Sequence, residues 1–155
     1  MSSTEAVIIR NAEPEDLGSI IQILAEDTLG KTREKFSHPL PASYVEAFIE
    51  IQNSGFNEIL VACLKEEIIA VCQVTYIPNL TFQGGRRAQI EGVRVDSAHQ
   101  SKGVGKKLIN EAIDRARKSG CKIVQLTSNK SRLQAIRFYE SLGFESTHEG
   151  MKIYL

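Results

Sequence analysis

Residues 93–106 decide the fold, and they read Val93-Arg94-Val95-Asp96-Ser97-Ala98-His99-Gln100-Ser101-Lys102-Gly103-Val104-Gly105-Lys106. An apolar strand leads through a polar turn into an amphipathic helix. Gly103 and Gly105 lack a β-carbon, so the backbone can approach a ligand closely there. The helix that follows presents unpaired N–H groups and the positive end of its dipole. The stretch therefore predicts an anion site at the start of this helix, suited to a pyrophosphate.

The glycine spacing excludes two other phosphate-binding motifs. A mononucleotide P-loop has four residues between its glycines, whereas only Val104 separates Gly103 from Gly105. A dinucleotide-binding fingerprint needs a third glycine where Leu108 stands and an acidic residue about 20 positions later, where the chain is apolar. An ordinary tight connection between a strand and a helix is the remaining alternative, and the flanking residues decide against it.

Two motifs in the chain resemble those of the GCN5-related N-acetyltransferase (GNAT) superfamily. The first is the Gln-x-x-Gly-x-Gly turn, present as Gln100-Ser101-Lys102-Gly103-Val104-Gly105. The second begins near Asn129 and ends in Ala135-Ile136-Arg137-Phe138-Tyr139-Glu140-Ser141-Leu142-Gly143-Phe144. The specific motifs occupy about residues 90–144, and the order of elements resembles the family from residue 7 to the C-terminus.

Length and charge set the broad class of protein. The 155 residues suit a single domain, which we expect to span residues 1–155. Since the 19 basic and 19 acidic residues cancel, no overall field would gather nucleic acid or an anionic membrane. The N-terminus has no leader pattern, and no stretch approaches the ~20 apolar residues of a membrane span. We expect a cytoplasmic protein that binds neither nucleic acid nor membrane.

Cysteine and histidine spacing gives no sign of a metal site. The odd cysteine count and the lack of CxxC spacing argue against a disulfide framework or zinc. Cys63 and Cys72 fall in apolar strands, where burial would make them inert. The histidines are scattered, with neither metal-ligand spacing nor a nucleophilic pairing: His38, His99 and His148.

Hydrophobic periodicity predicts alternating strands and helices. Strands are expected at residues 7–10, 59–64, 68–77, 88–95 and 122–127, with one or two closing strands in residues 144–155. Helices are expected from residue 14, over residues 41–53, after the glycine turn, and over residues 131–141; residues 29–40 and 78–85 are expected to be loops. This order predicts an α/β fold with a mixed, mostly antiparallel central sheet and helices on both faces, the acyl-CoA N-acyltransferase fold of the family that the chain resembles.

The resemblance implies acetyl-coenzyme A as the acetyl donor. Val93 and Val95 would bond the pantetheine arm through their main chains, as an added strand does. The pyrophosphate would lie against Gln100, Ser101, Lys102, Gly103, Val104, Gly105 and Lys106. For the valines the alternative is a plain buried strand, and for the lysines a solvated helix face. Asn129 matches a family position that bonds the pantetheine, but it could equally cap a helix.

Acetyl transfer to an amine needs a neutral nucleophile, so a base or a water chain must remove a proton. Glu91 is the candidate base, since strict alternation would put it on the same side of its strand as Val93 and Val95. The alternative is a surface carboxylate paired with Arg86 or Arg87.

Tyr139 stands where the family carries a tyrosine that protonates the departing thiolate. Without the flanking motif it would be interpreted as a core aromatic residue. A main-chain N–H near Val93 is expected to stabilise the oxyanion. Direct transfer in a ternary complex is preferred to an acyl-enzyme.

The acceptor is expected to be a small-metabolite amine, since no strongly acidic groove suggests a basic peptide. Its pocket should involve residues 29–44 and 78–87, and the possible contacts are Arg33, His38, Tyr44, Gln73, Thr75 and Tyr76. A non-catalytic sensor or interaction module that binds coenzyme A is the competing class of function. A homodimer is possible.

Overall fold

The computed structural model describes residues 6–155. A short strand and two helices come first, then a three-stranded meander, and then a strand between two helices. In chain order the elements are β1 (Ile8–Asn11), η1 (Pro14–Asp16), α1 (Leu17–Glu26), η2 (Gly30–Thr32), α2 (Ala42–Asn53), β2 (Asn57–Leu64), β3 (Glu67–Ile77), α3 (Thr81–Gly84), β4 (Arg87–Val95), η3 (Ser97–His99), α4 (Val104–Lys118), β5 (Ile123–Leu126) and α5 (Leu133–Ser141).

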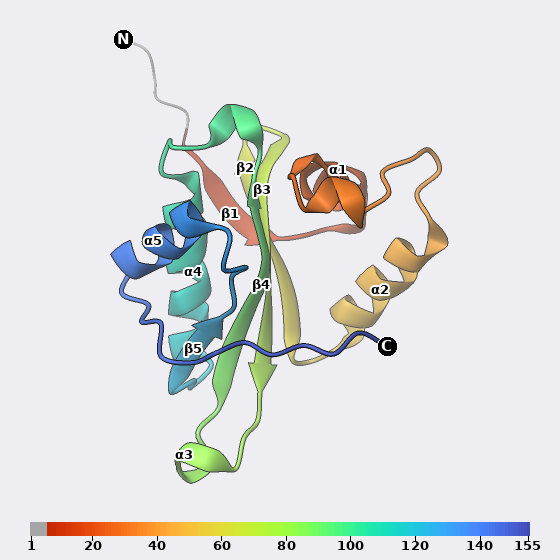
Figure 1. Cartoon of the computed structure of the whole chain (residues 1–155). Helices are drawn as coiled ribbons and strands as arrows, with labels where there is room; N and C mark the ends of the chain where they lie inside the picture. Colours follow the sequence, from red (N-terminus) through yellow and green to blue (C-terminus); the bar gives the residue numbers. More distant parts are fainter. Residues whose placement is uncertain (1–5) are drawn as a thin grey trace.

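The sheet follows the chain order β1-β2-β3-β4-β5 (Figure 1). The first three pairings are antiparallel, and the β2–β3 hairpin turns at the polar residues that separate the two apolar runs. Among the strand pairs of the described residues, only β4 and β5 run parallel, because α4 carries the chain back along the sheet between them. The mixed, mostly antiparallel sheet that the sequence predicts is confirmed.

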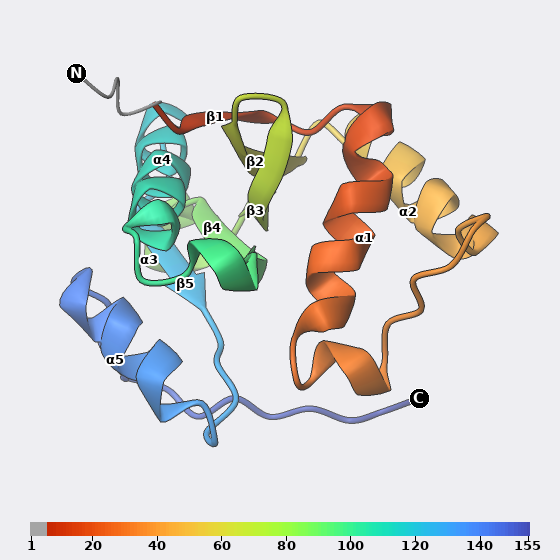
Figure 2. The ribbon, with the colours of Figure 1, turned by 90° about the horizontal axis from the view of Figure 1, so that it is seen from above.

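Helices cover both faces of this sheet, as Figures 1 and 2 show. On one face α4 packs against the central strands, and Leu108 and Ile109 are fully buried there with Leu60 and Ile69. On the other face α1 contacts β3 and α2 contacts β2, and Phe48 joins a second apolar cluster. The near-continuous apolar character of β2 and β3 reflects this double cover.

β4 contains a bulge next to Gly92. Gln73 pairs with Glu91, but Val71, two residues earlier on β3, pairs with Arg94, three residues later on β4. One extra residue is therefore inserted into β4. Gly92 has a φ of 60°, in the left-handed region that glycine adopts without strain.

The bulge reverses the alternation of side chains along β4. Cross-strand partners share a face, so Arg94 lies with Val71 on the α1 side, and Glu91 lies on that side as well. Val93 and Val95 pack against the core on the α4 side. The expectation that strict alternation places Glu91 beside the two valines is therefore wrong, because the bulge separates them.

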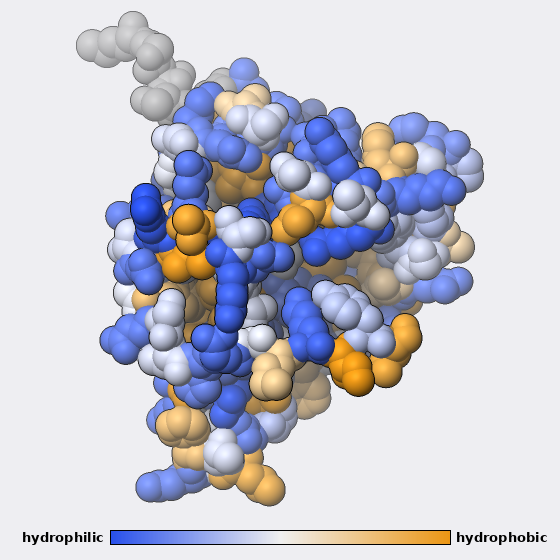
Figure 3. All heavy atoms as spheres, viewed as in Figure 1, coloured by the Kyte–Doolittle hydropathy of each residue, from blue (hydrophilic) through white to orange (hydrophobic). Residues whose placement is uncertain are grey.

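The expected closing strands are not formed. Residues 144–155 pair with no strand among the described residues, and Met151, Ile153 and Leu155 are exposed. The segment crosses the end of β5 instead of running beside it, since Gly150 approaches Thr127, just after that strand. Apolar side chains are visible in Figure 3 where Figure 1 draws the C-terminal end.

Both expected loops contain a single turn of helix. η2 lies within residues 29–40, and α3 lies within residues 78–85. α3 is irregular, because Phe82 and Gln83 both have positive φ. The helix expected from residue 14 starts as the separate turn η1 before α1, since Pro14 presets its φ and Asp16 bonds back to the N–H of Glu13 at 2.8 Å.

Candidate active site

The edge of β4 toward β5 is free over its C-terminal half. β4 pairs with β3 from Arg87 to Val95, but its pairing with β5 ends at Ile90. Within residues 6–155 no strand occupies this edge beyond Ile90, so β4 has no strand partner on this side there, although the carbonyls of Val93 and Val95 accept from the side chains of Arg94 and Gln100. The side chains of Val93 and Val95 pack inward while this edge stays open. Packing of the valines and binding through their main chain are thus compatible.

The glycine turn joins η3, which follows β4, to the start of α4. Ser101 and Gly103 have φ values of 59° and 79°, and Gly103 is the N-cap of α4 without a capping side chain. The first intrahelical bond joins the N–H of Lys107 to the carbonyl of Gly103 at 3.1 Å. Among the described residues no acceptor bonds the N–H groups of residues 104–106. These amides and the helix dipole form an anion-binding terminus.

The two glycines have different surroundings. A β-carbon on Gly103 would meet no atom within 4 Å, so the turn is open to a ligand at that position. A β-carbon on Gly105 would lie 3.4 Å from Cζ of Phe138 and 3.5 Å from Cγ2 of Val95. A β-carbon on Gly105 would thus make ordinary van der Waals contacts, and a larger side chain would crowd the packing of α4 against α5 and β4. These surroundings fit a diphosphate held by main-chain atoms.

The polar residues of the turn hold its shape and leave cations exposed. Gln100 donates from Nε2 to the carbonyl of Val95 at 3.3 Å, which ties the turn to the end of β4. Asp96 accepts from the N–H of Ala98 at 3.1 Å and contacts Nδ1 of His99 at 2.7 Å. Nearby lysines are exposed and form no ion pair within residues 6–155: Lys102, Lys106 and Lys107.

Tyr139 lies on α5, near the open edge of β4. Its ring packs against Phe138 and Phe144, with centroid distances of 5.2 and 5.9 Å. Burial raises the pKa of the Tyr139 hydroxyl, and the positive charges of Arg132 and Arg94 oppose that rise. A phenol whose pKa is raised keeps its proton at neutral pH, as a general acid must. The core position and the acid role are therefore compatible.

Glu91 is exposed on the α1 side of β4, opposite Gln73. The alternative pairing with Arg86 or Arg87 is not formed. Arg86 donates to the carbonyl of Ser119 at 3.4 Å, and Arg87 bonds Thr81 and Gln125. The carboxylate of Glu91 thus has no cationic partner among the described residues.

Of the other residues predicted for the site, some lie near it and others belong to the rest of the fold. Asn129 accepts from the N–H and the hydroxyl of Ser131 at 2.9 and 2.7 Å, so it holds the turn before α5. Tyr76 is buried in the α4-side core and donates to Glu58 at 2.9 Å, which removes it from the acceptor side. The segment 78–85 lies at the end of β4 opposite the glycine turn (Figure 1).

The remaining acceptor candidates lie on the α1 and α2 side. Tyr44 donates to Glu34 at 2.9 Å, and His38 packs edge-on against Phe36 in the same segment. Thr75 and Gln73 share the carbonyl oxygen of the Asn57 side chain as their acceptor. Arg33 lies just after η2, where its Nε donates to Glu34 at 3.1 Å.

The three cysteines are free thiols. Cys63 and Cys72 are buried, and burial raises the pKa of the Cys72 thiol to about 12. Within residues 6–155 no group of three or more His, Cys, Asp or Glu side chains is placed to hold a metal ion. No helix in that range is both long enough and apolar enough to span a membrane.

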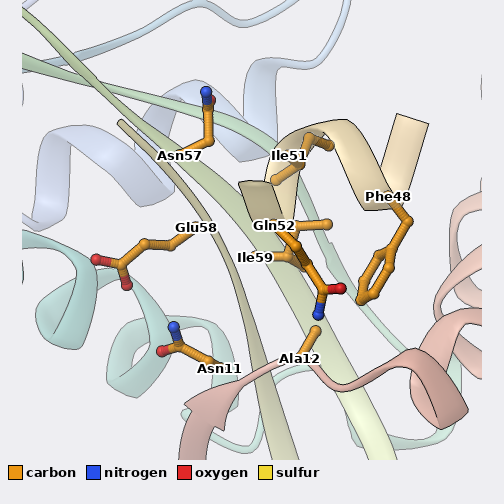
Figure 4. Close-up of a pocket in the computed structure, with 8 residues that line it drawn as sticks. All are labelled: Asn11, Ala12, Phe48, Ile51, Gln52, Asn57, Glu58 and Ile59. Carbon is orange, nitrogen blue, oxygen red and sulfur yellow. The ribbon is translucent and has the colours of Figure 1, made fainter. Parts of the chain in front are cut away.

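A cavity of about 230 Å³ lies between the end of α2 and strands β1 and β2 (Figure 4). It is lined by Asn11, Ala12, Phe48, Ile51, Gln52, Asn57, Glu58 and Ile59. Glu58 is already paired with Arg115 at 2.6 Å, so this charge serves the fold. The cavity is separate from the open edge of β4.

The sequence interpretation overlooked a buried ion pair beside the open edge. Arg94, from β4, contacts Asp27, just after α1, at 3.1 Å, and their side chains are 11% and 23% exposed. An arginine between two strand valines is the signal that could have found it, since a buried guanidinium needs a partner.

The sequence profile of the Acetyltransferase (GNAT) family matches residues 20–144. The chain belongs to this family. The match spans β4 with its bulge, the glycine turn and α5, so the resemblance carried by the two sequence motifs is confirmed.

Solved structures of GNAT proteins and other proteins share this fold closely. A Bacillus halodurans C-125 protein described as a transcriptional regulator is 49% identical, with a TM-score of 0.95 over 97% of this chain and 100% of that chain. Glucosamine-6-phosphate N-acetyltransferase from Arabidopsis thaliana is 26% identical, with a TM-score of 0.81 over 97% of this chain and 99% of that one.

An uncharacterised N-acetyltransferase of Methanocaldococcus jannaschii is 29% identical over 138 residues, which cover 88% of this chain. The matched residues span 60% of that relative's own length.

Proposed function

We propose that this protein is an N-acetyltransferase that moves an acetyl group from acetyl-coenzyme A to a primary amine. One observation carries the proposal: the free edge of β4 leads, through η3 and the glycine turn, to the unbonded first-turn amides of α4. The edge suits the amide-bearing pantetheine arm, and the amides suit the pyrophosphate. Family membership supports the same donor.

The amine attacks the thioester carbonyl, and the new C–N bond forms as the carbon becomes tetrahedral. A main-chain N–H near Val93 stabilises the oxyanion without reorganisation. The C–S bond then breaks, and Tyr139 gives its proton to the leaving thiolate. Glu91, directly or through water, takes the proton that the amine loses. Both side chains act from opposite sides of the bulged strand.

We favour a small-metabolite amine as the acceptor. The exposed segments near the open edge carry basic and hydroxyl side chains in addition to acidic ones. They therefore form no continuous acidic groove that would attract a basic peptide. The cytoplasmic location and the possible homodimer stay predictions from the sequence.

A regulatory module that binds coenzyme A without chemistry is the second candidate. The observation that favours it is the close similarity to the Bacillus halodurans protein described as a transcriptional regulator. Such a module keeps the glycine turn but has no need for a proton donor at Tyr139. The balanced charge of the chain offers no overall field for nucleic acid.

Thiol release separates the two candidates. Purified protein is mixed with acetyl-coenzyme A and a panel of amines, and free coenzyme A is measured against a blank without amine, which corrects for the protein's own cysteines. The enzyme releases thiol with at least one amine. Stabilisation by coenzyme A, about 2.7 kcal/mol at ~100 times the dissociation constant, without thiol release would favour the regulatory module. Absence of both contradicts both candidates.

A further inference from the structure

Three arginines from distant parts of the sequence gather at one side of the open β4 edge. Arg94 comes from β4, Arg33 follows η2, and Arg132 immediately precedes α5. Burial lowers the pKa of the Arg94 guanidinium, Asp27 opposes this, and the positive charges of Arg132 and Arg33 lower it further. In Figure 2 the end of α1 and the loop between β5 and α5 both lie toward the β4 and β5 end of the sheet, in the lower part of the view.

The acidic groups in this arginine cluster (Arg33, Arg94 and Arg132) do not balance the arginines. Asp27 pairs with Arg94 at 3.1 Å, and Glu34 pairs with Arg33 at 3.1 Å. Arg132 has no acidic partner within residues 6–155. The cluster therefore keeps an excess positive charge, and like charges held together favour an added anion.

The bonding of Arg94 is incomplete although its side chain is only 11% exposed. Its Nη1 donates to the carbonyl of Val93 at 2.7 Å, which fixes the guanidinium beside the open edge. Its Nε has no hydrogen-bond acceptor, and Oδ2 of Asp27 has no hydrogen-bond donor despite the ion pair. A buried guanidinium with spare donors is suited to a carboxylate or phosphate oxygen.

The arginine cluster also adjoins the candidate general acid. The positive charges of Arg132 and Arg94 both act on the Tyr139 hydroxyl. A molecule that placed an anionic group on these two arginines would therefore hold its remaining atoms near Tyr139 and the end of the β4 edge.

We infer that the acceptor amine carries an anionic group, a carboxylate or a phosphate, which Arg94 and Arg132 bind while Arg33 supports it from the rim. This inference rests on the proposed acetyltransferase function and narrows its substrate class. The anion offsets the repulsion among the guanidinium groups, and its position orients the amine toward the thioester.

Matched amine pairs test the inference in the thiol-release assay. Each pair is chosen so that the anionic group is the main difference: glucosamine 6-phosphate against glucosamine, and L-methionine against L-methioninol. We expect kcat/KM to favour the anionic member of at least one pair by about tenfold or more, as a charge-assisted hydrogen bond provides. The pair that discriminates identifies phosphate or carboxylate.

Arg132→Gln is the main variant, because Arg132 is only partly buried and forms no ion pair among the described residues, so the substitution leaves no acidic group without its partner. It should reduce the preference for the anionic member by about tenfold, leaving the neutral member and the KM for acetyl-coenzyme A unchanged. Arg94→Lys tests the bidentate geometry and keeps the charge that faces Asp27. Arg137→Gln, on the exposed side of α5, is the control with the same charge change.

Different outcomes would overturn the anionic acceptor and the acetyltransferase function. Equal or better acetylation of the neutral members overturns the anionic acceptor but leaves the enzyme intact. A rise in the KM for acetyl-coenzyme A in Arg132→Gln, without a change in acceptor preference, assigns Arg132 to the donor and also overturns it. If no amine reacts, the proposed function fails. Anion binding is then tested by thermal-shift titration with the same amine pairs. It is overturned if the anionic and the neutral member of each pair shift the melting temperature equally, in wild type and in Arg132→Gln.

Discussion

The first turn of α4 touches α5 at Gly105 and Phe138, where an added β-carbon would lie 3.4 Å from the ring. Val95 closes the same space from β4, at 3.5 Å. The end of the open strand, the anion-binding helix terminus and the helix of Tyr139 are thus packed together. Anything that separates α4 from α5 should disturb donor binding and catalysis at once.

Gly105→Val should lower the free energy of unfolding by about 1–3 kcal/mol, as overpacking does, and should weaken coenzyme A binding. Thermal denaturation and calorimetric titration measure the two effects. Gly18→Ala is the control, because a β-carbon on Gly18 in α1 would meet nothing within 4 Å. Unchanged affinity for coenzyme A in Gly105→Val would argue against the packed cradle.

Tyr139→Phe should lower kcat by roughly 10²- to 10⁴-fold, the usual contribution of a general acid, while donor affinity stays near that of wild type. The ring contacts with Phe138 and Phe144 survive this change, so the fold should be unaffected. Tyr154→Phe, on the exposed C-terminal segment, is the matched control. Wild-type turnover in Tyr139→Phe removes the residue from the acid role.

The pH dependence of this step follows from the same tyrosine. Since burial raises the pKa of Tyr139, the residue stays protonated through neutral pH and beyond the ordinary tyrosine value of about 10. The fall of kcat on the alkaline side should therefore come later than for an ordinary phenol. A pH–rate profile with an alkaline limb well below that value would show that another group supplies the proton.

Glu91→Gln should reduce kcat with amines that are protonated at neutral pH, and the loss should shrink as pH rises and the amine loses its proton unaided. Glu66→Gln, in the β2–β3 turn, is the control. Equal activity of Glu91→Gln and wild type across the pH range would leave a water chain as the route for the proton.

Local pattern predicts the parts of the fold that local chemistry determines. The apolar runs of β2 and β3 around a polar turn predict their hairpin, and Gly103 with Gly105 predicts the start of α4. The bulge was missed although a lone glycine inside a strand, Gly92, is its usual signal. Strict alternation consequently placed Glu91 on the wrong face.

Long-range features could not be found in this way. Alternating apolar residues at the C-terminus predict a strand, but the pattern does not say which sheet edge would pair with it. Among the described residues no strand pairs with this segment. Arg33, Arg94 and Arg132 are far apart in the sequence, so only the topology brings them together. The gap between β4 and β5 likewise follows from register, which no single segment encodes.

The carboxyl group of Asp16 should make the free energy of unfolding depend on pH in the acidic range. Its hydrogen bonds with Arg10, at 2.6 and 3.0 Å, hold the pKa of the carboxyl below its ordinary value. This stabilisation is complete above the unfolded-state pKa and is lost as pH falls through the lower folded-state pKa. Asp16→Asn should cost about 1–2 kcal/mol near neutral pH and much less in acid.

Urea denaturation at several pH values measures this effect, with Glu15→Gln, an exposed neighbour, as the control. An equal cost of Asp16→Asn at neutral and strongly acidic pH would contradict the role given to the ion pair.

Amide chemical shifts of the ¹⁵N-labelled protein during titration with coenzyme A locate the donor site residue by residue. We expect the largest shifts on residues 103–106, at the start of α4, and on Val93 and Val95 along the free edge. Shifts that gather instead around the cavity of Asn11 and Glu58, or saturating coenzyme A that leaves residues 103–106 unmoved, would contradict this donor site.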